Sequence, residues 1–149
     1  MKHITDQPLI LIAEDDPDDR LLFDEALNEL GLREQVAFVD NGEELLLYLR
    51  KLHLNSGDSQ RPMIVLLDLN MPRKDGREAL REIKEDPKLR SIPVVVMTTS
   101  TLEDDVQRSY ELGVNSFITK PATFERLVEA LDVVTTYWLK TVRLPGERA

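Results

Sequence analysis

The sequence has no cysteine, only two histidines and no long hydrophobic run among its 149 residues. Without cysteine, disulfide bonds and thiolate metal sites are excluded, and we assign His3 and His53 to the surface without a functional role. No stretch approaches the roughly 18 apolar residues that a membrane-spanning helix requires. The short apolar stretch near the N-terminus leads into acidic residues, whereas a signal peptide ends in small residues. We therefore expect a cytoplasmic protein with no membrane partner.

Basic residues are also few, since 19 Lys and Arg stand against 28 Asp and Glu and give a net charge of −9. A nucleic-acid-binding surface requires clustered Lys and Arg. Here the basic residues are scattered, so we expect no nucleic-acid partner, while the acid excess is compatible with a cation-binding site. The length suits one domain. Because no linker or repeat is visible, we expect a single domain over residues 1–149, with a core from about residue 8 to residue 142.

Short apolar runs alternate with segments of helical periodicity along the chain. The runs predict strands at residues 9–13, 36–39, 63–67, 92–97 and 114–119, and the periodic segments predict helices at residues 20–30, 43–54, 78–84, 102–112 and 124 to about 142. Continuously apolar strands are typical of a parallel sheet buried on both faces. Five such units predict a flavodoxin-like, doubly wound α/β fold with strand order 2-1-3-4-5. Asn55–Arg61 is the one clear polar loop.

Polar side chains follow the predicted strands, at the edge where this fold binds its ligands. They are Glu14 and Asp15 after the first strand, Asp68 after the third, Thr98 and Thr99 at the end of the fourth, and Lys120 with Pro121 after the fifth. Because the first and third strands are neighbours in the predicted order, Glu14, Asp15 and Asp68 should converge. The acids that follow, Asp16, Asp18 and Asp19, are better explained as a helix cap and first-turn charges.

Converging carboxylates repel one another unless a cation lies among them. All nearby donors are oxygens, which favours Mg²⁺, although Mn²⁺ or Ca²⁺ could replace it in vitro. We expect Asp15, Asp68 and the backbone carbonyl of Asn70 to bind the ion, with Glu14 contributing directly or through water. The arrangement predicts in-line attack of Asp68 on a phosphoryl donor. Lys120 would supply positive charge, and Thr98 a hydroxyl donor.

These residues resemble those of the receiver domain of two-component response regulators. The resemblance is carried by Glu14-Asp15, Asp68, Thr98, Lys120-Pro121 and the phrases LLDLNMPRKDG and IPVVVMTTS. It implies that a histidine kinase phosphorylates Asp68, that Thr98 moves towards the phosphoryl group and that Phe117 changes rotamer with it. It also implies a cis bond between Lys120 and Pro121, which only an X–Pro bond adopts at low cost.

A narrower resemblance lies in the phrases TTSTLEDDV, YELGVNSFITKP and YWLKTVRLP. They are similar to those of stand-alone response regulators that partner bacterial phytochromes, which implies a phytochrome kinase as partner, no output domain and a homodimer. One departure is Thr99, which stands where a smaller Ala or Gly is usual in the family. It could slow the entry of donor and water.

Two other classes of function compete with the receiver. A haloacid-dehalogenase-type phosphatase also uses a strand-end Asp, but it needs a second Asp where this chain has Asn70, which cannot transfer a proton. A phosphorylation-independent adaptor would be expected to lack one of the acids, the Thr or the Lys, and none is lacking. We therefore expect no enzyme beyond self-catalysed phosphorylation of Asp68 and slow dephosphorylation.

The last predicted helix has more apolar surface than one contact with the sheet needs. Phe124, Leu127, Leu131, Val134 and Trp138 form the stripe that should face the sheet, and Ala130, Val133 and Tyr137 form a second strip beside it. Either this is one broad core stripe, or the second strip is a partner surface. The second reading predicts a homodimer through the fourth helix, fifth strand and fifth helix, with Tyr110, Ala130, Val133, Tyr137 and Trp138 on the dimer face.

Overall fold

The computed structural model describes residues 9–56 and 63–145, and its centre is a five-stranded sheet in the order β2-β1-β3-β4-β5. The strands are β1 (Ile10–Ala13), β2 (Val36–Val39), β3 (Ile64–Leu67), β4 (Val94–Thr98) and β5 (Ser116–Thr119). Every neighbouring pair is parallel. The predicted fold class and strand order are confirmed. Ala13 is in register with Leu67, so the acids that follow β1 and β3 leave the sheet side by side.

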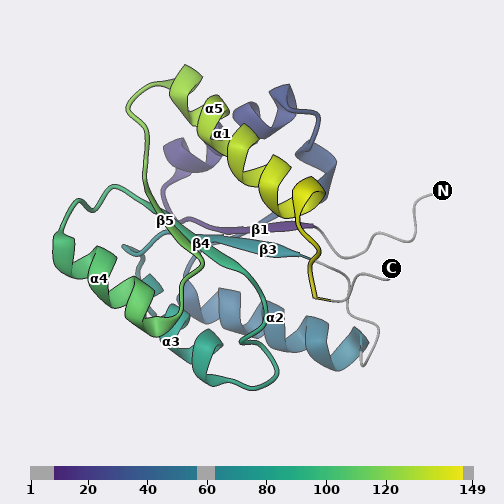
Figure 1. Cartoon of the computed structure of the whole chain (residues 1–149), viewed down its shortest axis with the longest axis vertical. Coiled ribbons are helices and arrows are strands. Elements are labelled where there is room, and N and C mark those ends of the chain that lie inside the picture. Colours follow the sequence, from purple (N-terminus) through teal and green to yellow (C-terminus); the bar gives the residue numbers. More distant parts are fainter. Residues whose placement is uncertain (1–8, 57–62, 146–149) are drawn as a thin grey trace.

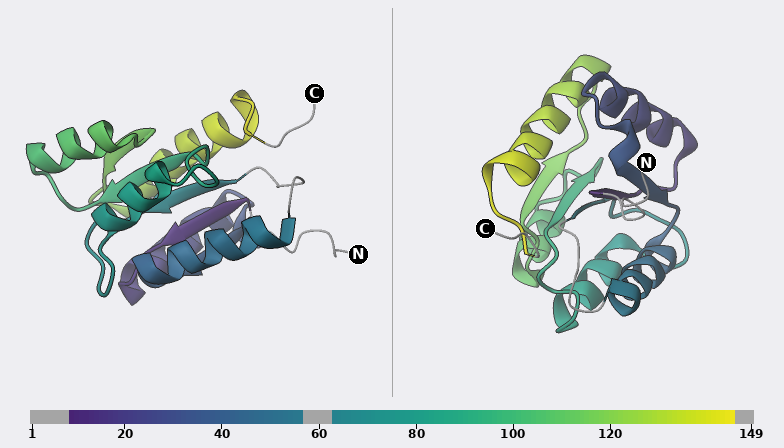
Figure 2. Two further views of the ribbon diagram at one scale, coloured as in Figure 1. Left: turned by 90° about the horizontal axis from the view of Figure 1, so that it is seen from below. Right: turned by 90° about the vertical axis from the view of Figure 1, so that its right-hand side faces the viewer.

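The helices are α1 (Pro17–Glu29), α2 (Gly42–Ser56), α3 (Gly76–Glu85), α4 (Glu103–Leu112) and α5 (Phe124–Thr136). Helices α1 and α5 cover one face of the sheet and α2 and α3 the other, while α4 lies near the β5 edge (Figures 1 and 2). The predicted cap of α1 is confirmed, because Asp16 accepts a hydrogen bond from the Asp19 backbone N–H at 3.0 Å. Helix α4 ends at Gly113, whose φ of 106° suits glycine.

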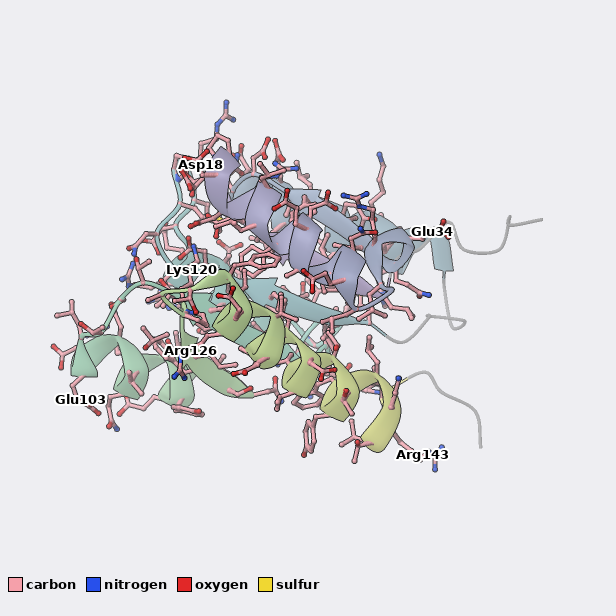
Figure 3. The ribbon with its side chains drawn as sticks, turned by 90° about the horizontal axis from the view of Figure 1, so that it is seen from above. Asp18, Glu34, Glu103, Lys120, Arg126 and Arg143 are labelled. Atoms are coloured by element: carbon pink, nitrogen blue, oxygen red, sulfur yellow. The ribbon has the colours of Figure 1, made fainter. Side chains whose placement is uncertain are left out.

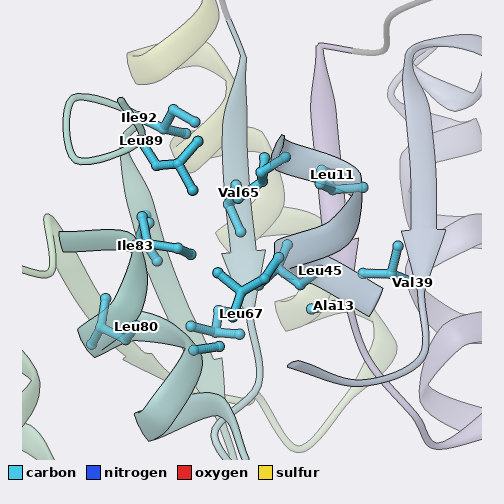
Figure 4. Close-up of a cluster of buried hydrophobic side chains, with 14 of the residues drawn as sticks. Leu11, Ala13, Val39, Leu45, Val65, Leu67, Leu80, Ile83, Leu89 and Ile92 are labelled. Atoms are coloured by element: carbon cyan, nitrogen blue, oxygen red, sulfur yellow. The ribbon is translucent and has the colours of Figure 1, made fainter. Parts of the chain in front are cut away.

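The hydrophobic core is split by the sheet into two layers. Because successive strand residues point to opposite faces, Leu11, Val65 and Val96 pack under α2 and α3, as the close-up in Figure 4 shows for part of that layer. Their neighbours Ile12 and Leu66 pack under α1 and α5. Burying each such side chain stabilises the fold by about 1.5–3 kcal/mol. Both faces of β1, β3 and β4 are covered, which is why these strands are continuously apolar.

Several predicted boundaries differ from the structure by one to three residues, and the last helix changes type near its predicted end. The last α-helix ends at Thr136, and the chain continues to Thr141 as a π-helix, because wider hydrogen bonds such as Val142 N to Tyr137 O, at 3.0 Å, replace the α-helical ones. Helix α2 extends through Asn55 and Ser56, which were predicted to lie in a loop. Residues 57–61 of that loop, like His3, lie outside the described residues. No helix in the described part of the chain is long and apolar enough to cross a membrane.

Candidate functional site

Three acids converge where β1 and β3 end. Glu14, Asp15 and Asp68 each offer a carboxylate oxygen within 4.8 Å of the others. The sheet positions two of them through its backbone, because Glu14 N donates to Val39 O at 3.0 Å and Asp68 N donates to Ala13 O at 3.1 Å. Glu14 is 1% exposed and Asp68 is 7% exposed, whereas Asp15 is exposed. The site therefore has a buried floor and one acid at its mouth.

Lys120 closes the site from the end of β5. Its Nζ donates to Glu14 Oε1 at 2.6 Å and to Asp68 Oδ2 at 3.2 Å. A third hydrogen bond, at 2.7 Å, reaches Asp19 Oδ2 on α1. Figure 3 shows Lys120 where the sheet meets α1 and α5. Lys120 N also donates to Thr98 O at 2.7 Å, which fixes the lysine to β4. One ammonium group thus donates hydrogen bonds to three carboxylates.

The charges of the site are strongly perturbed. Burial raises the pKa of Glu14 to about 7, with the hydrogen bond from Lys120 opposing the rise and the charge of Asp68 adding to it. Burial alone would lower the pKa of Lys120, but its hydrogen bonds to Asp19 and Glu14 raise that pKa above its usual value. Lys120 is therefore firmly charged and still outnumbered by acids. The surplus of carboxylate oxygens, without nitrogen or sulfur donors, fits a hard divalent cation such as Mg²⁺.

The second oxygen of Asp68 faces a hydroxyl and a backbone amide. Thr98 Oγ1 donates to Asp68 Oδ1 at 2.9 Å, and Asn70 N donates to the same oxygen at 3.2 Å. Thr98 is fully buried. The structure thus brings the side chains of Thr98 and Lys120 into direct contact with Asp68, from the ends of three different strands.

Other predicted residues lie around this centre. Thr99 is exposed and Phe117 is half-buried, and Phe117 packs against the core layer under α2 and α3. The expected cis bond before Pro121 is wrong, because no peptide bond between described residues is cis. An X–Pro bond still favours the trans form by about 0.5–1 kcal/mol, and the Lys120 contacts form with the trans bond.

Sequence reasoning missed two parts of this region. Asp19 was assigned only to the first turn of α1, yet it pairs with Lys120. Its position one turn after Glu14 and Asp15, on a helix that begins at the site, was the available signal. The pairing of Arg77 with Asp105 at 2.8 Å had no signal, since these residues lie on different helices and far apart in sequence.

The response regulator receiver domain family matches residues 10–132. The chain belongs to this family. As a receiver domain of two-component signalling, it is 43% identical over 138 residues to the probable methanogenesis regulatory protein FilR2 of Methanothrix harundinacea, covering 93% of this chain and 88% of that protein. It is 42% identical over 138 residues to response regulator Rcp1 of Synechocystis, covering 93% of each.

Solved structures of receiver domains agree with the fold. The phosphorylated cyanobacterial phytochrome response regulator RcpA superimposes with a TM-score of 0.80 at 44% identity, covering 91% of this chain and 96% of that one. The Mn²⁺-bound form of Rcp1 superimposes with a TM-score of 0.77 at 39% identity, covering 93% of this chain and 99% of that one. The first of these structures is of a phosphorylated protein, and the second is of a Mn²⁺-bound protein.

Proposed function

We propose that this receiver domain accepts a phosphoryl group on Asp68 from the phosphohistidine of a histidine kinase, in the presence of Mg²⁺. The observation that supports this most directly is the contact of one buried carboxylate with both a lysine ammonium group and a threonine hydroxyl, next to two further acids. No single residue of this set is distinctive, but together they match what phosphoryl transfer requires, which is positioning and charge neutralisation.

In the proposed step an Asp68 oxygen forms a bond to phosphorus while the phosphorus–nitrogen bond of the donor breaks, and the leaving imidazole keeps the electron pair. Asp15, Asp68, the Asn70 backbone carbonyl and Glu14, directly or through water, would hold the ion. When bound, Mg²⁺ supplies positive charge for the phosphoryl oxygens. Lys120 supplies a second positive charge. The Thr98 hydroxyl, which now donates to Asp68, would donate to a phosphoryl oxygen instead. Phe117 would change rotamer as Thr98 moves.

We propose that the donor reaches Asp68 from the side of Asp15, the exposed acid of the site. A groove of about 850 Å³ opens beside Asp15 and is lined by residues of α1, β2 and the segment after β3. Thr99 is exposed and directly follows Thr98, which contacts Asp68, and we propose that the Thr99 side chain slows the entry of donor and water. Thr99→Ala should therefore speed both phosphorylation and hydrolysis. Because Thr99 is exposed, the free energy of unfolding should change by less than about 0.5 kcal/mol. Unchanged rates would contradict this role.

A phytochrome-type histidine kinase is the partner that we propose. Two relatives are phytochrome response regulators by name or crystal structure, RcpA and the bacteriophytochrome response regulator RtBRR, which is 37% identical. The similarity to FilR2 is equally high, so the choice needs a direct test. A phytochrome kinase should transfer its phosphoryl group to this protein faster than a histidine kinase of unrelated input does. Equal rates would contradict the phytochrome assignment.

The decisive experiment is to incubate the protein with a small phosphodonor and Mg²⁺ and to measure its intact mass. The proposal predicts one added phosphoryl group on the wild type, none on Asp68→Asn, and none when EDTA removes the metal. Asn70→Asp is the control for phosphatase activity, because it introduces the second Asp that a haloacid-dehalogenase-type phosphatase needs. Continuous release of phosphate from many small esters would indicate a phosphatase, and no modification with any donor would indicate an adaptor. Either result would overturn the proposal.

We also propose a homodimer through α4, β5 and α5. Tyr110, Val133 and Tyr137 are 51%, 68% and 49% exposed. Ala130 and Trp138 are half-buried and pack against the core layer under α1 and α5, so they would contribute only the edge of the dimer face. An exposed apolar surface of this kind is a suitable place for a protein contact.

A further inference from the structure

Arg77 and Asp105 join α3 to α4 through two parallel hydrogen bonds. Arg77 Nε donates to Asp105 Oδ1 at 2.8 Å, and Nη2 donates to Oδ2 at 2.8 Å. Such paired, charge-assisted bonds are strong and directional. Asp105 is only 8% exposed. Hydrogen bonds from Arg77 and Ser100 lower the pKa of Asp105 to about 2, so the carboxylate is charged at neutral pH and fixed to α3.

The same guanidinium group reaches back towards the acid site. Arg77 Nη1 and Nη2 each lie 3.4 Å from Asn70 Oδ1, and Asn70 N donates to Asp68 Oδ1 at 3.2 Å. Each contact at 3.4 Å is long for a hydrogen bond, but the rigid guanidinium presents two nitrogens to one oxygen. Asn70 is also the residue whose backbone carbonyl we assign to the metal. Arg77 thus contacts the side chain of a residue that we propose as a ligand of the ion.

A second chain of contacts leads from Asp68 to the same carboxylate. Thr98 Oγ1 donates to Asp68 and accepts from Ser100 N at 3.5 Å, the weakest link. Ser100 Oγ in turn donates to Asp105 Oδ2 at 2.5 Å. The two chains, one through Asn70 and Arg77 and one through Thr98 and Ser100, therefore meet at Asp105 in the first turn of α4.

From this convergence we propose that Arg77 is a positioning residue that couples the acid site to α4 through Asp105. This inference rests on the proposed function, because it concerns regulation of the same site. Asn70 is held by Arg77 in the orientation that suits the ion, and α4 is held by Asp105 in the position that suits Arg77. Such coupling is reciprocal. A change at α4 alters the affinity of the acid site for Mg²⁺, and binding of Mg²⁺ to the acid site reduces the motion of α4.

The test is Mg²⁺ binding to the 149-residue protein by titration calorimetry, with Mg²⁺ alone as the probe. Arg77→Lys keeps the positive charge but loses the paired geometry, and Asp105→Asn keeps the shape but loses the charge. We expect each to raise the Mg²⁺ Kd about fivefold or more. The double variant should bind no more weakly than the weaker single variant, because both act through one contact.

Arg81→Lys is the matched control. Arg81 lies one turn further along α3 and, like Arg77 and Asp105, lines a groove of about 410 Å³ between α3 and α4. Within the described residues it donates to neither Asn70 nor Asp105. Its replacement should leave the Mg²⁺ Kd unchanged. A second readout is hydrogen exchange of the α4 amides, which Mg²⁺ should slow in the wild type and slow much less in Asp105→Asn.

The outcomes separate coupling from a purely structural ion pair. Variants that unfold more easily but bind Mg²⁺ as the wild type does would overturn the inference and leave the proposed function intact. A wild-type protein that binds no Mg²⁺ and accepts no phosphoryl group would overturn both. Weaker binding in Arg77→Lys and Asp105→Asn, with an unchanged Arg81→Lys, would support the coupling.

Discussion

Lys120 carries most of the charge balance of the acid site. Its side chain is 11% exposed and contacts carboxylates of Glu14, Asp19 and Asp68. Buried charges of one sign are tolerated only when an opposite charge or a metal accompanies them. Within the described residues, no other cation contacts Glu14 or Asp68, so Lys120 is the group that compensates their charge there.

Replacing Lys120 with Met should therefore lower the free energy of unfolding by about 3 kcal/mol without Mg²⁺, because removal of one partner leaves buried charge without compensation. Mg²⁺ should raise the melting temperature of this variant more than that of the wild type, since an ion that binds the folded state stabilises it and no longer competes with the ammonium group. Thermal unfolding at increasing Mg²⁺ concentration measures both effects.

Lys88→Met is the control, because Lys88 is exposed and lies outside the acid site. Its unfolding free energy should stay within about 0.5 kcal/mol of the wild type. A Lys120 variant that is as stable as the wild type without metal would contradict this account of the site.

The sequence predicted the residues at the centre of the site better than those around it. Asp68 and Lys120 were identifiable because each ends a strand whose neighbours in the sheet could be inferred. Asp19 was not, because a first-turn acid is explained equally well by the helix dipole, and only coordinates show which way it points. The contact between Arg77 and Asp105 depends on how α3 and α4 pack, which no local pattern encodes.

At the scale of elements, the junction between β3 and α3 leaves no room for a side chain. A Cβ added to Gly76 would lie 2.2 Å from the Asp68 backbone oxygen and 2.7 Å from Leu69 Cα. Gly76 N also donates to Leu69 O at 2.9 Å. The start of α3 is therefore pressed against the segment that carries Asp68, and glycine is required by space here.

Gly76→Ala should lower the free energy of unfolding by about 3 kcal/mol, as overpacking of a fixed backbone does, and should slow phosphorylation of Asp68 by displacing it. Gly31→Ala is the comparison. Its φ of 75° costs an alanine about 1 kcal/mol, but nothing lies within 4 Å of the added Cβ, so phosphorylation should be unaffected. Urea unfolding and intact mass measure the two effects, and equal behaviour of the two variants would refute the steric explanation.

The ion pair between α3 and α4 should make stability depend on pH in acid. The pKa of Asp105 falls from 3.8 to about 2 on folding. A lowered pKa contributes stability that is fully present well above 3.8 and is lost as the pH falls through 2. For Asp105, which is buried, this amounts to roughly 2 kcal/mol at neutral pH.

Asp105→Asn should therefore be less stable than the wild type by about 2 kcal/mol at pH 7, and by about half of that at pH 3, because the wild type loses the contribution as the carboxylate takes up a proton. Urea unfolding of both proteins at the two pH values tests this. Asp104→Asn, on the exposed side of the same helical turn, is the control. A difference that stays constant from pH 7 to pH 3 would contradict the assigned charge.

For the whole molecule, the arrangement of the sheet was predictable and the ends of some helices were not. Continuously apolar strands separated by helices allow few topologies, so the order β2-β1-β3-β4-β5 follows from general rules. The extension of α5 into a π-helix at Tyr137 depends on which backbone carbonyl accepts the hydrogen bond of each amide. Tyr137 and Trp138 also pack edge to face with ring centroids 5.1 Å apart. Periodicity alone predicts neither.

That end of the molecule is where the proposed dimer can be tested. Val133 and Tyr137 lie one turn apart and are exposed by 68% and 49%, although both are large and apolar. A stable interface buries about 800 Å² on each partner, which these two residues cannot supply alone. Tyr110 extends the surface to β5, because its hydroxyl accepts a hydrogen bond from Phe117 N at 3.2 Å.

A double variant with Val133→Glu and Tyr137→Glu should sediment as a monomer at concentrations at which the wild type is dimeric. In a two-fold dimer the new glutamates of one protomer would face those of its partner and repel them. Leu47→Glu is the control, since Leu47 is 64% exposed but lies on α2, across the sheet from α5. Phosphorylation of Asp68 should proceed in all three proteins, which shows that the variants fold. If the wild type sediments as a monomer both with and without phosphoryl group, the surface of α4, β5 and α5 serves another partner than a second copy of the chain.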